Sequence, residues 1–220
     1  MKSIILLAPP AAGKGTQSKL ICNKYKVPHI STGDLLRSAV RNNHPLAQTI
    51  NELINSGSFV TDDIVLDLLK ERLSSGDCDN GYVLDGFPRN VEQAVTYEEI
   101  LKSIDKEFGI VILLDIDRNI AKNRIIGRLS CSTCGSVYNS MFDETKSKTE
   151  GTCDNCHSGL SKRDDDNEET FDKRFDTYVE KTKPLIDYYN DKDILYRVDS
   201  GINKEYTFNE IEKIIKEQND

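Results

Sequence analysis

Residues 3–17, with the sequence SIILLAPPAAGKGTQ, decide how the chain begins to fold. The apolar run from Ile4 to Leu7 predicts a buried strand, a tight loop of proline, alanine and glycine follows, and Lys14 opens a helix. In such a unit the backbone N–H groups and the positive end of the helix dipole converge on phosphate oxygens, and the lysine reaches the terminal phosphates. The stretch therefore predicts a phosphate-binding loop, with a plain strand–turn–helix as the alternative.

Apolar runs that are typical of strands recur along the chain and alternate with helical patterns. They are Ile4 to Leu7, Tyr82 to Leu84, Ile110 to Ile116 and Ile194 to Val198. Continuous apolar runs between helices favour an α/β fold with a doubly wound parallel sheet that is covered on both faces. Thr61 and the two aspartates after it predict a helix start, and Gly76 its end. Apolar residues at helical spacing within residues 208–215 predict a last helix that packs on the core.

Two segments interrupt this alternation. Residues 31–60 are helical with stops at Pro45 and Gly57. Residues 127–166 are polar, rich in glycine, serine and cysteine, and show no helical period. We therefore expect two insertions in a core made of residues 1–30, 61–126 and 167–220.

Length and charge limit the classes of function. The chain has 220 residues, enough for a sizeable core, and a net charge of −8, which argues against nucleic acid or an anionic membrane as the main partner. No apolar run approaches a membrane span, and the run at residues 4–7 is too short for the core of a signal peptide. We expect a cytoplasmic monomer whose six cysteines are thiols or metal ligands rather than disulfides.

Four of the cysteines form two pairs. Cys131 and Cys134 make one CxxC pair, and Cys153 and Cys156 make another after 18 intervening residues. This spacing is typical of a zinc site in which each of two turns presents two sulfurs. Four thiolates leave no open coordination position, so the predicted zinc is structural. A redox dithiol, which normally needs only one CxxC pair, and incidental thiols are the alternatives.

Arginines bracket the cysteine segment. Arg124 and Arg128 are four residues apart on the helix expected to enter it, so they share a face, and a phosphate between them would remove their repulsion. A solvated helix face is the alternative. Arg163 opens an acidic run that ends at Thr170, and Arg174 follows on the next helix. Acidic runs are usually solvated caps, but these arginines border the core that carries the predicted phosphate loop.

Two further motifs follow predicted strands. In the segment YVLDGFPR, Asp85 ends an apolar strand where P-loop proteins hold Mg²⁺ directly or through water. The Gly-Phe-Pro turn then aims Arg89 over the edge of the sheet at which doubly wound folds bind ligands. The segment STGD at residues 31–34 predicts a helix start with Arg37 one turn in, where Thr32 is either a plain N-cap or a binding residue.

Together these motifs resemble the adenylate kinase family, in its long, zinc-bearing bacterial type. GKGTQ, ISTGDLLR, LDGFPRN followed by Gln93, the R-x-D-D-x-E-E-T run at residues 163–170 and the four-cysteine segment occur in the family's order over essentially the whole chain. The resemblance implies a P-loop NTPase-like core, an AMP-binding insertion at residues 31–60 and a lid at residues 127–166 that closes over ATP. Members usually carry glycine where this chain has Ala8 and Ala11.

The resemblance also implies site residues. ATP would contact Ala11, Ala12, Gly13, Lys14, Gly15, Thr16, Arg128, Val137, Tyr138 and Ile202. AMP would contact Thr32, Arg37, Ser58, Phe59, Val60, Gly86, Phe87, Pro88, Arg89, Gln93, Arg163 and Arg174. Catalysis would rest on Lys14, Arg89, Arg124, Arg128, Arg163 and Arg174. Mg²⁺ would be held through water by Thr16 and Asp85, and the structural Zn²⁺ by Cys131, Cys134, Cys153 and Cys156.

The implied reaction is reversible, MgATP plus AMP giving two ADP, and it maintains the balance of adenine nucleotides. Cations surround the transferring phosphoryl group and a closing lid excludes water. A kinase for another nucleoside monophosphate would share the core, but Thr32 and Gln93 favour adenine by resemblance. A zinc-ribbon module for nucleic acid would need a basic segment, whereas residues 131–156 hold two lysines against four acidic residues.

Overall fold

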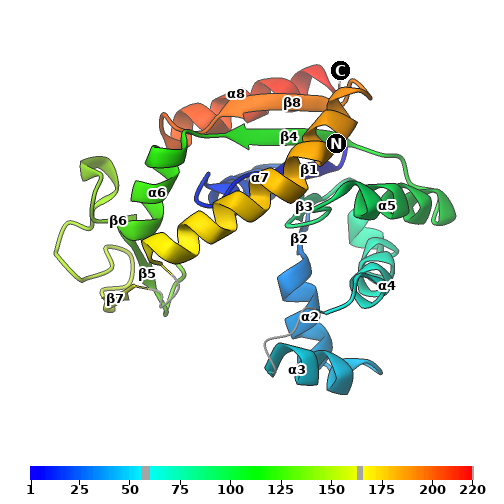
Figure 1. The fold of residues 1–220 in the computed structure, drawn as a ribbon, viewed down its shortest axis with the longest axis horizontal. Coiled ribbons are helices and arrows are strands. Elements are labelled where there is room, and N and C mark those ends of the chain that lie inside the picture. Colours follow the sequence, from blue (N-terminus) through cyan, green and yellow to red (C-terminus); the bar gives the residue numbers. More distant parts are fainter. Residues whose placement is uncertain (56–59, 163–165, 220) are drawn as a thin grey trace.

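A five-stranded parallel sheet forms the centre of the molecule (Figure 1). It is seen in a computed structural model that describes residues 1–55, 60–162 and 166–219. The strand order is β2-β3-β1-β4-β8, from His29–Ser31, Val83–Asp85, Ile4–Leu7, Ile110–Asp115 and Leu195–Asp199. The four predicted strands are confirmed to within one residue at either end. The edge strand β2 has the sequence HIS, in which only Ile30 is apolar, so it gives no apolar run.

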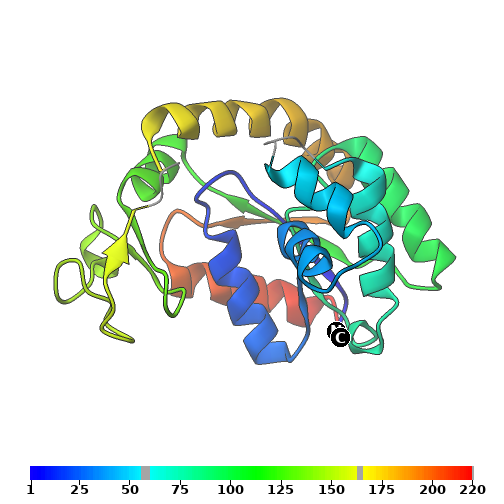
Figure 2. The same ribbon diagram turned by 90° about the horizontal axis from the view of Figure 1, so that it is seen from below.

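Helices cover both faces of this sheet. In strand β1, Ile5 and Leu7 pack into one apolar cluster, while Ile4 and Leu6 pack into another on the opposite face. Helices of the first cluster are α4 (Asp62–Leu73), α5 (Val91–Ser103) and the C-terminal half of α7 (Glu168–Asn190). Those of the second are α1 (Lys14–Tyr25), α6 (Arg118–Ile126) and α8 (Lys204–Glu217), as Figure 2 shows for α1 and α8 below the sheet. The two buried faces confirm the doubly wound α/β fold.

Both predicted interruptions have their own structure. Helices α2 (Thr32–Arg41) and α3 (Ala47–Asn55) extend away from the sheet (Figure 1) and share a small apolar cluster of Ala39, Ile50 and Leu68 with α4. The second segment forms an antiparallel sheet of order β6-β5-β7, from Val137–Asn139, Arg128–Cys131 and Leu160–Ser161. Strands this short explain why the segment carries no helical period.

The structure contradicts the prediction that Arg124 and Arg128 share a helical face. Helix α6 ends at Ile126, and Arg128 is the first residue of strand β5. Gly127, at the C-cap of α6, allows Asn139 of the neighbouring strand to pack closely, because a Cβ atom on residue 127 would lie 2.3 Å from Asn139 Oδ1. The repulsion expected for two arginines four residues apart on a helix therefore does not arise.

Helix boundaries also differ from the prediction in places. Thr61 holds the N-cap position of α4 as expected, but α4 ends at Leu73, and Gly76 instead begins the short 3-10 helix η1 (Gly76–Cys78). Ser31, with extended backbone, is the N-cap of α2, so Thr32 is not a plain cap but the first helical residue, and it is 7% exposed. Within the described ranges, no helix is both long and apolar enough to cross a membrane.

Candidate active site

A cleft of about 2860 Å³ lies between the central sheet and the two insertions. Most of the predicted nucleotide contacts line it: Ala11, Ala12, Gly13, Lys14, Gly15, Thr16, Thr32, Val60, Gly86, Phe87, Pro88, Arg89, Gln93, Arg124, Arg128, Val137, Tyr138, Arg174 and Ile202. Arg37 and Asp85 do not line it, and among the four predicted zinc ligands Cys134 alone does. Ser58, Phe59 and Arg163 lie outside the described residues. Segments far apart in the sequence thus meet around one space.

The loop between β1 and α1 opens into this cleft. Helix α1 begins at Lys14, and Gly13 at its N-cap has a left-handed φ of 86°. A Cβ atom on Gly13 or Gly15 would meet nothing within 4 Å, so the space in front of the loop is open. The first N–H groups of a helix have no partner within the helix and carry the positive end of its dipole. The loop is therefore built to accept an anion from the cleft.

Ala11 holds a backbone conformation that favours glycine. Its φ is 63°, whereas Ala8 is not among the residues with positive φ. A side chain in the left-handed region costs about 1–2 kcal/mol, which glycine does not incur. The glycine that family members usually carry at both positions therefore has a backbone reason at residue 11 alone.

Replacing Ala11 with glycine should stabilise the loop in this conformation. We expect a thermal midpoint higher by roughly 1–3 °C and ATP binding that is several-fold tighter, because the nucleotide no longer has to hold alanine in a strained conformation. Thermal melts and ATP titrations measure both. Ala8→Gly is the matched control, and it should slightly destabilise the protein because it only adds freedom to the unfolded chain. Equal effects of the two substitutions would contradict the strain at Ala11.

Lys14 is held at the end of the sheet by Asp85. The Lys14 ammonium lies 3.0 Å from Asp85 Oδ1, and His29 Nε2 lies 3.3 Å from Asp85 Oδ2. Parallel pairing brings these groups together, because β3 lies between β1, which precedes the phosphate loop, and β2, which carries His29. Burial acts to raise the pKa of Asp85, but the hydrogen bond from His29 and the charge of Lys14 outweigh it and lower that pKa. Asp85 is therefore an ionised carboxylate beside the phosphate loop.

The Gly-Phe-Pro turn presents Arg89 to the cleft. Phe87 is 2% exposed and anchors the turn in the apolar cluster of α4 and α5. Gly86 has a left-handed φ of 82°, and Arg89 Nε donates a hydrogen bond to its carbonyl oxygen at 2.8 Å. A Cβ atom on Gly86 would lie 3.6 Å from both Arg89 and the Thr32 hydroxyl. The turn thus brings the arginine and the start of α2 to the same side of the cleft.

Arg124 and Arg128 reach the cleft from different elements. Burial lowers the pKa of Arg124, with partial compensation from Asp199, and its guanidinium donates to the Gly201 carbonyl oxygen at 3.3 Å. Arg128 instead makes a two-pronged ion pair with Asp166, with Nε 2.8 Å from Oδ2. Asp166 is 1% exposed, so this pair ties the first strand of the cysteine segment to the start of α7. The sequence did not single out Asp166, because it lies within an acidic run.

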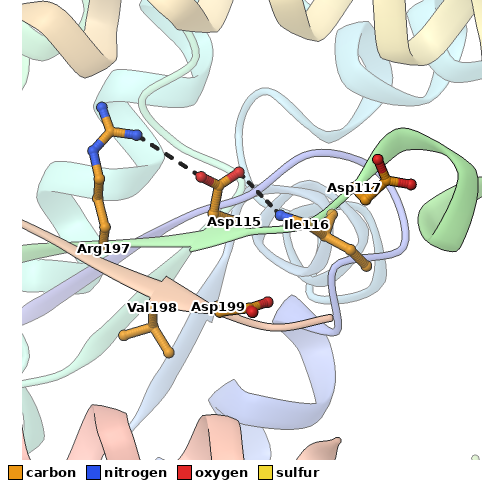
Figure 3. Close-up of a pocket in the computed structure, with 6 residues that line it drawn as sticks. All are labelled: Asp115, Ile116, Asp117, Arg197, Val198 and Asp199. Carbon is orange, nitrogen blue, oxygen red and sulfur yellow. Dashed lines mark hydrogen bonds and ion pairs between the residues drawn. The ribbon is translucent and has the colours of Figure 1, made fainter. Parts of the chain in front are cut away.

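A smaller hollow of about 440 Å³ lies at the ends of β4 and β8 (Figure 3). It is lined by Asp115, Ile116, Asp117, Arg197, Val198 and Asp199. Asp115 accepts a hydrogen bond from the Ile116 N–H at 3.0 Å and faces Arg197, and Asp117 caps α6. Asp199 accepts from the Gly201 N–H at 2.7 Å, which fixes the loop that carries Ile202 into the larger cleft. The carboxylates of Asp115, Asp117 and Asp199 thus fix the backbone that follows strands β4 and β8.

Comparisons with known proteins identify the family to which the chain belongs. A family model described as adenylate kinase matches residues 6–194. The chain belongs to the adenylate kinase family. Its relatives include proteins named adenylate kinase from Clostridium botulinum (strain 657 / Type Ba4), 41% identical over 96% of this chain and 97% of that protein, and from Archaeoglobus fulgidus, 42% identical over 97% and 98%. One from Thermodesulfovibrio yellowstonii is 42% identical over 98% of this chain and 99% of its own.

Membership of the adenylate kinase family confirms the resemblance seen in the motifs. It confirms that the chain is a nucleoside monophosphate kinase with an α/β fold of the P-loop NTPase kind. The matches extend over nearly the full length of the chain and of the relatives. The family therefore applies to the chain as a whole.

The four predicted cysteines come together in the structure. Their sulfurs all lie within 4.8 Å of one another, with Cys131 and Cys156 at 3.4 Å and Cys134 and Cys153 at 3.5 Å. Sulfurs that bind one zinc ion at about 2.3 Å in a tetrahedron are roughly 3.8 Å apart, so the cluster fits such an ion. All four are free thiols rather than disulfides. The prediction of one four-sulfur cluster is confirmed.

Tyr138 supports this cluster from the neighbouring strand. Its hydroxyl accepts a hydrogen bond from the Asp154 N–H at 2.8 Å and lies 3.5 Å from Cys153 Sγ, to which it donates. This donation is the largest of several hydrogen bonds, including those from the backbone of Asn155 and Cys156, that lower the pKa of Cys153 to about 5. Tyr138 thus joins the strand after the first cysteine pair to the turn of the second.

Replacing Tyr138 with phenylalanine should weaken the hold on a metal ion. The lowered pKa of Cys153 keeps the thiolate available as the pH falls toward 5, and without the hydroxyl that pKa should rise. The metal should then be lost at a higher pH than in the parent protein. Elemental analysis after incubation at stepped pH measures the midpoint of release. Tyr206→Phe, on α8 outside the cluster, is the control, and an unchanged midpoint in Tyr138→Phe would contradict the support.

Proposed function

We propose that this chain catalyses the reversible transfer of a phosphoryl group from MgATP to AMP, giving two ADP, and so maintains the balance of adenine nucleotides. The observation that carries the proposal is that one cleft is lined by both the phosphate loop, residues 11–16, and the turn at residues 86–89. Two phosphate-binding motifs that face the same space are what direct transfer between two nucleotides requires. Membership of the adenylate kinase family supports the choice of nucleotides.

We assign ATP to the side of the cleft that carries the phosphate loop and the cysteine segment. The open N–H groups around Gly13 support binding of its phosphates, and Lys14 supplies the nearest cation. Val137 and Ile202 are 55% and 54% exposed, and apolar side chains facing the cleft suit the flat base of a nucleotide. The proposed ATP contacts are Ala11, Ala12, Gly13, Lys14, Gly15, Thr16, Arg128, Val137, Tyr138 and Ile202.

We assign AMP to the side formed by the turn and α2. Thr32, Arg89 and Gln93 line this side, and Gly86 lies between the first two. Arg37 lies one turn into α2, 2.5 Å from Asp34, and would have to leave that exposed ion pair to meet a phosphate. The proposed AMP contacts are Thr32, Arg37, Val60, Gly86, Phe87, Pro88, Arg89, Gln93 and Arg174, and for Ser58, Phe59 and Arg163 the assignment stays a prediction from the resemblance.

The proposed catalytic task is to align two nucleotides and to balance negative charge. As the bond between the γ-phosphorus and the β–γ bridging oxygen of ATP breaks, a phosphate oxygen of AMP bonds to that phosphorus, and charge spreads over the transferring group. Positively charged side chains face the cleft, among them Lys14, Arg89, Arg124 and Arg174. Their charges can stabilise the transferring group directly, so no side chain has to be phosphorylated. Arg128 would join them from its ion pair with Asp166. Closure of residues 127–166 would keep water from the phosphoryl group.

Two metal ions fit this proposal. Mg²⁺ enters with ATP and neutralises its phosphates, and Thr16 and the ionised Asp85 offer the oxygen groups that would hold its water ligands. Zn²⁺ fits the four-sulfur cluster, where Cys131, Cys134, Cys153 and Cys156 would complete its coordination. A filled coordination sphere gives zinc a structural role and no part in the transfer. We further propose that the chain acts as a cytoplasmic monomer that binds neither nucleic acid nor membrane, in keeping with its net charge of −8.

A coupled assay of the purified protein with MgATP tests the proposal. AMP, CMP, UMP and GMP are offered separately as acceptors, and the formation of ADP is measured for each. We expect turnover with AMP to exceed turnover with the others by a wide margin. Preferential turnover of CMP, UMP or GMP would replace the proposal by a kinase for that monophosphate, and no turnover with any would reject it.

Replacing Gln93 with alanine should weaken AMP selectively. Gln93 is 9% exposed and lines the cleft, so its amide can pair with a base edge that is shielded from water. Leaving such an edge unpaired costs about 1–3 kcal/mol, so the KM for AMP should rise roughly tenfold while the KM for ATP stays within about twofold. Steady-state kinetics with each nucleotide varied in turn measure both constants. An equal change in both would remove Gln93 from the AMP side.

A further inference from the structure

The side-chain amide of Gln93 is held at both ends. Its oxygen accepts a hydrogen bond from the Arg89 backbone N–H at 2.8 Å, and its nitrogen donates to Asp62 Oδ1, also at 2.8 Å. Asp62 is the first residue of α4 and lies 31 residues before Gln93 in the sequence. The backbone of Gln93 is fixed as well, because its N–H donates to the Asn90 side chain at the N-cap of α5.

These two contacts allow only one orientation of the amide. A backbone N–H can only donate, and a carboxylate can only accept. If the amide turned over, its NH₂ group would face the Arg89 N–H and its oxygen would face the Asp62 carboxylate, which sets donor against donor and acceptor against acceptor. Both distances are 2.8 Å, and the contact with Asp62 is the stronger of the two because its acceptor is charged. Asp62 therefore fixes which end of the amide is nitrogen.

The fixed amide can still donate one hydrogen bond to a ligand and accept one from it. One N–H of the nitrogen and one lone pair of the oxygen are not used by Asp62 and Arg89, and the residue lines the cleft. Adenine presents an acceptor nitrogen beside the N6 amino donor, which matches an amide in a set orientation. Guanine presents the reverse pattern at its N1–H and O6, and an amide that could turn over would accept it equally well.

We infer that Asp62 is a specificity-determining residue, which holds the Gln93 amide in the orientation that fits adenine and so excludes guanine from the monophosphate side of the cleft. It is a positioning residue, because it acts through Gln93 and touches no reacting atom. The inference rests on the proposed function, since it deepens the choice of monophosphate. From the sequence alone, Asp62 was predicted only to lie in the acidic first turn of a helix.

Asp62→Ser tests the inference, with Asp63→Ser as the matched control. Serine suits the start of a helix, so the fold should be kept, but its hydroxyl is too short to reach the Gln93 nitrogen. Asp63 carries the same charge in the same helical turn and is exposed. Within the described residues, it forms no hydrogen bond with Gln93. Asp62→Asn is the conservative variant, because its carbonyl oxygen can accept the same hydrogen bond.

The measured quantities are kcat/KM for AMP and for GMP at saturating MgATP, the KM for ATP, and the thermal midpoint. We expect Asp62→Ser to lower the AMP-to-GMP ratio of kcat/KM about tenfold with an unchanged KM for ATP, Asp62→Asn to restore most of the ratio, and Asp63→Ser to leave it unchanged. A ratio unchanged in Asp62→Ser, or lowered as much in Asp63→Ser, would overturn the inference. Parent protein that fails to phosphorylate AMP would instead reject the proposed function itself.

Discussion

Replacing Lys14 with methionine should lower kcat about 100- to 1000-fold. Methionine keeps the length and apolar stem of the side chain but removes the ammonium that lies at the start of α1, 3.0 Å from Asp85. Removal of one charged group that stabilises a transition state costs a factor of this size. The KM for AMP should change little, because Lys14 lies on the ATP side. Steady-state kinetics in the coupled assay, with ATP affinity from a separate titration, give the two effects independently.

Lys183→Met is the control for the loss of one positive charge. Lys183 is exposed on α7 and does not line the cleft, so its replacement should leave kcat within about twofold of the parent value. If Lys14→Met kept more than a tenth of the parent kcat with an intact fold, the ammonium could not be a main source of charge stabilisation.

Replacing Cys153 with serine should strip the metal and destabilise the cysteine segment without abolishing catalysis. A metal ion that binds only the folded form contributes its binding free energy to folding, and one lost thiolate breaks the tetrahedron. We expect metal content well below one ion per chain and a thermal midpoint lower by roughly 10 °C. Activity at low temperature should remain substantial, because Arg124, Arg128 and Arg174 lie outside the cluster.

Cys22→Ser provides the matched control, because Cys22 is a free thiol on α1 that takes no part in the cluster. It should keep the metal content of the parent protein. Absence of any bound metal in parent protein purified without chelator would remove the zinc assignment. Complete loss of turnover in Cys153→Ser protein that still binds AMP and ATP would show that the cluster does more than support structure.

The features predicted from the sequence are those that short segments determine by themselves. The run Ile4 to Leu7 is apolar because both faces of β1 are buried, and the phosphate loop follows from the residues next to it. The four cysteines were predicted as one cluster because each CxxC turn already brings two sulfurs together. In these cases the spacing of residues along the chain carries the spatial information.

The partners that hold functional side chains could not be predicted in the same way. Asp166 pairs with Arg128 across 38 residues, and Asp62 binds Gln93 across 31, so each contact depends on tertiary packing. Aspartates at the starts of helices are common for electrostatic reasons, and nothing local distinguishes one that fixes an amide. The false helical pairing of Arg124 with Arg128 has a different cause, because Gly127 is a local stop signal at which α6 ends after Ile126.

The cysteine segment restricts substitutions at fewer positions than a segment with an apolar core would. Among residues 127–162, the buried ones are Gly127, Cys131, Asn139 and Cys153, and no apolar core joins the strands and turns. In a core of packed side chains, every residue tolerates few substitutions, because a change of size at one position leaves a gap or a clash with its neighbours. With a metal ion bound, the four sulfurs would carry most of that restriction, beside the contacts of Gly127, Arg128 and Tyr138. Exposed residues of the segment that do not line the cleft, such as Lys148 and Glu150, can therefore change in charge without disturbing a packed core.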